Sequence, residues 1–70
     1  MSQITYFLLN GQSYYTKQHL TLLDIIMYFN YNDSLLVLEL NHLVSNKNEW
    51  QQTFVNNQDK LEIVSIVGGG

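Results

Sequence analysis

The sequence contains no cysteine, arginine, proline or alanine. Without cysteine, no disulfide can cross-link the fold, and no thiolate can act as a nucleophile, redox centre or metal ligand. Any sulfur that the protein handles must therefore be held by a group other than a side-chain thiol. Apart from cysteine, the missing residues are mostly encoded by GC-rich codons. This indicates an AT-rich genome, such as that of a plastid or an AT-rich bacterium.

Positive charge is scarce as well. The chain has three lysines and six acidic residues, so its net charge is −3. Nucleic acids and anionic membranes both select clustered basic residues, so we expect neither as a partner. No signal peptide is recognisable, and the apolar stretch 4–9 is too short to span a bilayer. We expect the protein in the compartment where it is made: the cytoplasm if bacterial, the plastid stroma if plastid-encoded.

The composition is nevertheless that of a folded protein, with 46% hydrophobic residues, five Tyr, three Phe and one Trp. A chain of 70 residues forms one small domain that buries only about 60% of its unfolded surface. We find no internal repeat or boundary. The sequence therefore predicts a single domain over 1–70, in which 68–70 form a flexible C-terminal glycine tail.

Local signals predict a hairpin followed by a helix. Residues 4–9 are rich in β-formers, and Asn10-Gly11 favours a tight turn into a second strand over 12–17. Thr21 and Asp24 have the spacing of a helix N-terminus in which each caps the other. The apolar residues that follow at helical spacing are Leu22, Ile25, Ile26 and Phe29.

Three further strands are predicted in the second half. They cover 35–40, a short stretch through Leu43 and Val44 after a turn at Asn41-His42, and 61–67. Between the last two lies the polar segment 46–58. Its predicted core anchors are Trp50, Phe54 and Val55. This order predicts an α+β fold, a sheet packed on one main helix.

One helix covers only one face of such a sheet, yet strand 61–67 is apolar on both faces. An uncovered apolar face commonly marks a partner site. We predict a partner surface formed by Val64, Ile66 and Val67. In the alternative, segment 46–58 folds over that face and covers it with Trp50 and Phe54.

The most informative feature is the run Gly68-Gly69-Gly70 directly after the last strand. Glycine has no Cβ, so such a tail is slim and can thread a narrow channel. No side chain hinders attack at the terminal carboxylate, as an enzyme that adenylates this group requires. Glycine tails also occur as cloning remnants or disordered ends.

The chain resembles the ThiS family, the sulfur carriers of thiamine biosynthesis, over almost its whole length. The most specific part is 59–70, which ends in Ser65-Ile66-Val67-Gly68-Gly69-Gly70. Three other segments also fit: 9–11, 21–26, and 40–44 followed by Trp50. Two positions depart from the family, which often has glycine where this chain has His42 and Gln58. Both lie in turns.

The resemblance implies a β-grasp (ubiquitin-like) fold, in which a mixed sheet packs on one main helix. It also implies a sulfur-carrying co-substrate with no catalytic residues and no bound cofactor of its own. An adenylyltransferase of the E1-like family would use ATP and Mg²⁺ to adenylate the Gly70 carboxylate. A persulfide donor would then supply sulfur to form a thiocarboxylate, and thiazole synthase would accept that sulfur. Gly68 and Gly69 would thread the tail into the partner enzymes.

Three alternatives remain. They are a sulfur carrier for molybdopterin synthesis, a ubiquitin-like modifier joined to lysines through its glycine end, and a plain interaction domain. No residue pattern suggests catalysis or a metal site: His19 and His42 are far apart in the sequence, and neither lies beside carboxylates at ligand spacing. We expect Glu39, Glu49 and Glu62 to be solvated charges.

Overall fold

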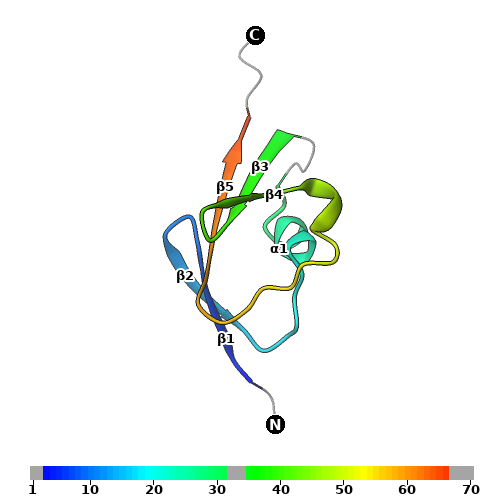
Figure 1. Ribbon diagram of the computed structural model, residues 1–70. Helices are drawn as coiled ribbons and strands as arrows, with labels where there is room; N and C mark the ends of the chain where they lie inside the picture. The colour runs from blue at the N-terminus through cyan, green and yellow to red at the C-terminus, as the bar shows by residue number, and fades with distance from the viewer. Residues whose placement is uncertain (1–2, 32–34, 67–70) are drawn as a thin grey trace.

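The computed structural model describes residues 3–31 and 35–66. Within them, five strands form one mixed sheet and a single α-helix, α1, packs across one face (Figure 1). The sheet order is β2-β1-β5-β3-β4, and only the β1–β5 pair is parallel. The α+β prediction, a mixed sheet on one main helix, is confirmed.

The hairpin joins β1 (Thr5–Leu9) to β2 (Gln12–Thr16) as the Asn-Gly signal predicts. Asn10 and Gly11 both have positive φ, 51° and 81°, which is what a two-residue turn between twisted strands requires. Phe7 faces the core, and the ring of Tyr14 on β2 stacks over it.

Helix α1 (Leu22–Tyr28) begins at the predicted capping box. The backbone N–H of Asp24 donates to Thr21 Oγ1 at 3.1 Å, and the N–H of Thr21 donates to Asp24 Oδ2 at 2.9 Å. The helix ends where Asn30 adopts φ 62° and Tyr31 donates to the carbonyl of Ile26. Asparagine tolerates this left-handed conformation, so it can take the terminating position usual for glycine.

The second half adds β3 (Leu36–Leu40), β4 (Leu43–Ser45), a short 3₁₀ helix η2 (Lys47–Glu49) and β5 (Asp59–Ser65). The turn at 41–42 lies at two positive φ values, 53° and 72°. Strand β5 lies at the centre of the sheet, between β1 and β3 (Figure 1).

Segment 46–58 packs beside the helix and not on the far face of the sheet. Trp50 is buried with residues of α1, and its carbonyl accepts the N–H of Leu23. The indole N–H donates to the carbonyl of Ser45 at 3.0 Å. Our alternative, in which this segment covers the outer face, is therefore wrong.

The anchors of this segment are only partly as predicted. Trp50 and Val55 belong to the buried core, whereas Phe54 is 41% exposed. Its ring instead stacks on His19, with ring centroids 3.9 Å apart. The single-residue pairing of Phe54 with Thr21 explains the difference, because it aligns this part of the segment with the chain just before α1.

The predictions for Val67, Gly68, Gly69 and Gly70 lie outside the described residues. Among the residues that the structure describes, no helix is long and apolar enough to cross a membrane.

Candidate functional site

Strand β5 carries the chain toward its C-terminal end, and its two edges are paired unequally. Residues 61–65 pair with β3, whereas β1 pairs only with 59–61. Beyond Leu61, β5 and β3 therefore extend past the β1–β2 hairpin (Figure 1). The last described backbone bond of this strand runs from the N–H of Ile66 to the carbonyl of Leu35 at 2.6 Å.

Two asparagine side chains replace strand partners along β5. On the β1 side, Asn10 Oδ1 accepts the N–H of Ile63 at 2.8 Å, just beyond the end of the β1 pairing. On the β3 side, Asn41 Oδ1 accepts the N–H of Lys60 at 2.9 Å, and Asn41 Nδ2 donates to Asp59 Oδ1 at 3.0 Å. Both asparagines lie in hairpin turns, so the turns also fix the position of β5.

Asp59, the first residue of β5, takes part in the same hydrogen bonds around the start of the strand. Its side chain is only 9% exposed, and it accepts hydrogen bonds from Asn41 and, at 2.7 Å, from the backbone N–H of Asn56. A buried carboxylate is tolerated when donors satisfy it in this way. The preceding residue, Gln58, has φ 69° and donates its N–H to the carbonyl of Tyr6.

The face of the sheet opposite the helix carries exposed apolar side chains near the end of β5. Val64 is 57% exposed and Ile66 52% exposed. The register places Val37 of β3 directly opposite Val64 of β5. Val44 of β4 pairs with Glu39, which lies two residues after Val37 on the same face of β3. We call this set the outer patch: Leu35, Val37, Val44, Val64 and Ile66.

Of the three predicted partner-surface residues, Val64 and Ile66 belong to the outer patch, and Val67 lies outside the described residues. Their role in binding stays a prediction. The sequence analysis did not assign Leu35, Val37 or Val44 to this surface. Alternation along β3 could have indicated Val37, since odd-numbered residues of that strand share one face, whereas Leu35 lies just before the strand.

One expectation about charged residues is wrong. His42 does lie beside carboxylates: its imidazole approaches Glu39 and Glu62, and one ligand atom from each residue lies within 4.8 Å of the others. Sequence spacing could not reveal this group, because Glu62 joins it only through the pairing of β3 with β5. His19 lies elsewhere, stacked on Phe54.

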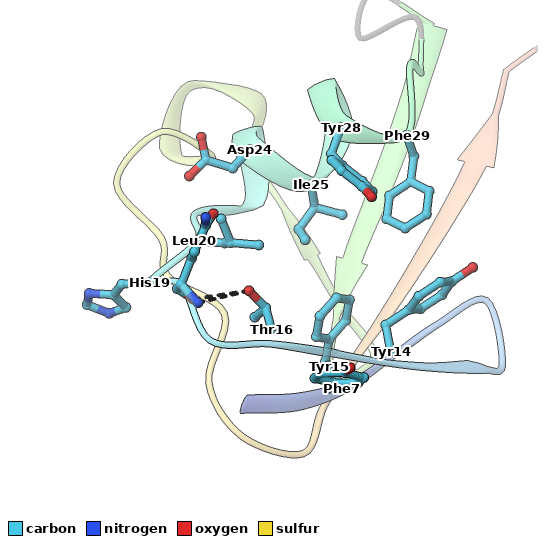
Figure 2. A pocket seen from close by; sticks show the side chains of 11 residues that line it. Phe7, Tyr14, Tyr15, Thr16, His19, Leu20, Asp24, Ile25, Tyr28 and Phe29 are labelled. Carbon is cyan, nitrogen blue, oxygen red and sulfur yellow. Dashed lines mark hydrogen bonds between the residues drawn. The ribbon is translucent and has the colours of Figure 1, made fainter. Parts of the chain in front are cut away.

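A cavity of about 520 Å³ lies between β2 and α1. Five of its eleven lining residues are Phe or Tyr, and Figure 2 shows Tyr14 and Phe29 next to each other on its wall, where their rings pack edge to face with centroids 5.1 Å apart. Two of its polar groups already have local partners: Asp24 caps the helix, and Thr16 Oγ1 accepts the N–H of Gln18. The cavity presents no paired acid and base for catalysis among its described residues.

Comparison with solved structures supports the fold assignment. The crystal structure of the thiamine biosynthesis protein (ThiS) from Geobacter metallireducens superposes with a TM-score of 0.80. The match covers 94% of this chain and all of that chain, at 20% sequence identity. The fold is therefore the ThiS β-grasp fold, as the resemblance implied.

Sequence comparisons extend this likeness. The ycf40 protein of Trieres chinensis is 52% identical over 64 residues, which are 91% of this chain and 88% of that protein. The ycf40 proteins of Porphyra purpurea and Pyropia yezoensis are each 32% identical over 62 residues, covering 89% of this chain and 87% of theirs. The ThiS family matches residues 7–70, including the glycine tail. The chain belongs to the ThiS family.

Proposed function

We propose that this protein carries sulfur for thiamine biosynthesis as a thiocarboxylate on Gly70. The observation that carries the proposal is membership of the ThiS family over 7–70, a match that includes the three glycines. The absence of cysteine agrees with it, because the chain offers no thiol on which sulfur could be held.

The proposed chemistry takes place at the carboxylate. An adenylyltransferase of the E1-like family joins Gly70 to AMP, using ATP and Mg²⁺ and releasing pyrophosphate. The terminal sulfur of a donor persulfide attacks the activated carbonyl and AMP leaves. A thiol then cleaves the resulting acyl disulfide and leaves the thiocarboxylate, whose sulfur passes to thiazole synthase. Adenylation turns a poor leaving group into a good one, so the carrier itself needs no catalytic residue.

The described residues support the carrier role in two ways. The strand before the tail is central in the sheet, and Asn10 and Asn41 hold its two edges. The outer patch lies near the end of the same strand, so an enzyme that receives the tail could bind this apolar surface. We propose that Gly68 and Gly69 thread the tail and that the outer patch contacts the partner enzymes.

The algal plastid origin of the ycf40 relatives is consistent with the plastid stroma as the place of action. The names of these relatives do not state a pathway, so the experiment must separate thiamine synthesis from molybdopterin synthesis. It must also separate both from protein modification and from plain interaction.

The test is the intact mass of the protein after incubation with its adenylating enzyme, Mg-ATP, a persulfide source and a thiol that cleaves the acyl disulfide. We expect one oxygen to be exchanged for sulfur, and we expect a variant lacking Gly69 and Gly70 to keep its mass. Thiazole synthase should then consume the thiocarboxylate. Consumption by molybdopterin synthase alone would assign the other pathway, and isopeptide adducts on lysines would indicate a modifier. An unchanged mass with a proven active enzyme would refute the carrier role.

A further inference from the structure

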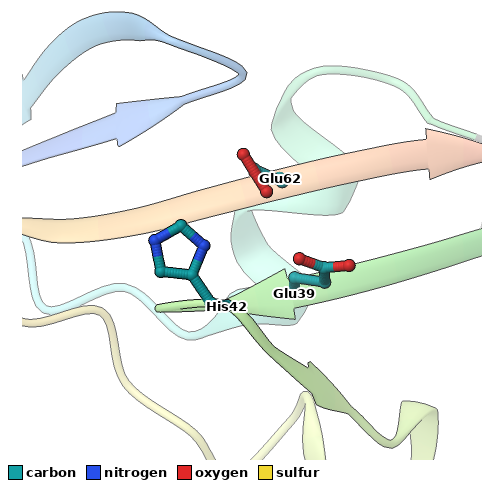
Figure 3. A group of neighbouring side chains, drawn as sticks. All are labelled: Glu39, His42 and Glu62. Carbon is teal, nitrogen blue, oxygen red and sulfur yellow. The ribbon is translucent and has the colours of Figure 1, made fainter.

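The outer face of the sheet carries a cluster of nitrogen and oxygen donors that the proposed sulfur chemistry does not use. Glu39 lies on β3, Glu62 on β5 and His42 in the β3–β4 turn. Figure 3 shows the three side chains on the same face, with the imidazole near both carboxylates. One ligand atom from each residue lies within 4.8 Å of the other two.

The sheet register brings the two carboxylates together. Glu39 and Glu62 are direct partners in the antiparallel pairing of β3 with β5. Like charges at directly opposed positions destabilise a sheet unless a cation lies between them. Within residues 3–31 and 35–66, neither carboxylate forms a salt bridge, and Lys60 on the same face of β5 pairs with neither.

The imidazole adds the nitrogen donor that distinguishes this group from a simple acidic pair. His42 reaches it from a turn that is tied to β5, because Asn41 binds both Lys60 and Asp59. All three donors therefore project from backbone that is held by strand pairing or hydrogen bonds. A preformed scaffold of this kind lowers the cost of ordering the ligands when an ion binds.

The donor set and spacing suit zinc. Zn²⁺ binds histidine nitrogen and carboxylate oxygen at about 2.0–2.2 Å, so its ligand atoms lie about 3.4 Å apart in a tetrahedral site. From a maximum separation of 4.8 Å the ligand atoms must approach one another by up to about 1.4 Å to reach this spacing, and the side chains of His42 and Glu62 are exposed. Three protein ligands leave a fourth position for water or a partner's side chain.

We propose that Glu39, His42 and Glu62 bind one divalent transition-metal ion, with Zn²⁺ as the best fit, on the outer face of the sheet. The ion would neutralise the opposed carboxylates and crosslink β3, β5 and the turn between β3 and β4. This proposal does not depend on sulfur transfer, and its test measures binding of the metal alone.

The test is calorimetric titration of the full, tag-free, metal-stripped protein with Zn²⁺, alongside NMR of its imidazole signals. We expect one equivalent to bind, with shifts at His42 and none at His19. His42→Asn tolerates the left-handed turn but removes the imidazole, and Glu62→Gln removes a carboxylate. Each should weaken binding by more than about tenfold. The matched controls, His19→Asn and Glu49→Gln, should bind as the parent does.

Thermal unfolding gives a second readout. Zn²⁺ should raise the Tm of the parent protein and of both controls, because it binds the folded state, and it should leave His42→Asn unchanged. Mg²⁺ prefers all-oxygen sites and should not replace Zn²⁺. Absence of binding at millimolar Zn²⁺, equal affinity in parent and His42→Asn, or NMR shifts confined to other residues would each overturn the proposal.

Discussion

Replacing Asn10 tests whether a turn side chain holds the strand that carries the tail. The N–H of Ile63 points toward the β1 side of β5, where β1 has already ended, and Asn10 Oδ1 accepts it at 2.8 Å. Asn10→Gly keeps the left-handed turn but removes this acceptor. We expect β5 to lose a hydrogen bond that nothing else in the described structure replaces.

The magnitude follows from the environment of the bond. Ile63 is only 7% exposed, and a buried donor left unsatisfied costs about 1–3 kcal/mol. Part of this cost is offset, because glycine adopts φ 51° without the left-handed strain that asparagine carries there. The net loss in unfolding free energy should be about 1–2 kcal/mol, which lowers the Tm by roughly 7–14 °C.

Asn10→Asp is the matched control. Aspartate also tolerates the left-handed region and keeps an oxygen in place, so its stability should lie within about 0.5 kcal/mol of the parent. The assay is urea unfolding, monitored through the fluorescence of Trp50. Amide hydrogen exchange is measured for each residue as a second readout. Exchange at Ile63 should accelerate in Asn10→Gly, while that at Lys60, held by Asn41, should not. Equal stability of the Gly and Asp variants, with unchanged exchange at Ile63, would refute this reasoning.

Three further substitutions probe other parts of the molecule. Gln58→Gly should raise the unfolding free energy measured in urea by about 1 kcal/mol, because φ 69° suits glycine; a lower stability would contradict the reasoning. Trp50→Phe should lower the free energy of unfolding, measured by thermal unfolding, by about 2–3 kcal/mol, because it leaves a cavity in the core and removes the N–H that donates to the carbonyl of Ser45. A loss below about 0.5 kcal/mol would argue against Trp50 as a core anchor. Val64→Lys should change the Tm little but weaken affinity for the adenylating enzyme, measured by titration. Met27→Lys, on an exposed site of α1, is its control, and an equal effect of both would exclude the outer patch as the binding surface.

The elements that could be predicted from the sequence are those determined by neighbouring residues. The Asn10-Gly11 turn and the capping box of Thr21 and Asp24 require only residues up to three positions apart, and both occur as predicted. The order of the strands in the sheet is not local, and local signals did not provide it; only the resemblance to the ThiS family implied the β-grasp fold.

The incorrect predictions concern contacts between distant segments. Whether Trp50 faces the helix side or the outer side depends on how 46–58 crosses the molecule, and the polar composition of that segment does not determine it. Phe54 is apolar enough for a core position, yet its pairing with Thr21 leaves it at the surface. His42 meets Glu62 only through the register of two strands, so spacing along the chain gives no sign of that contact.

The two hairpin turns illustrate why asparagine suits positions beside β5. Asn10 and Asn41 each adopt a positive φ, which glycine would meet with less strain. Glycine, however, has no side chain to accept the N–H of Ile63 or Lys60. One residue type thus meets two demands: it closes a tight turn and it replaces a missing strand partner. On the proposed function, this fixes the direction in which β5 delivers its tail, because the strand is held from both edges before the glycines begin. The sheet can then present a constant surface to a partner enzyme.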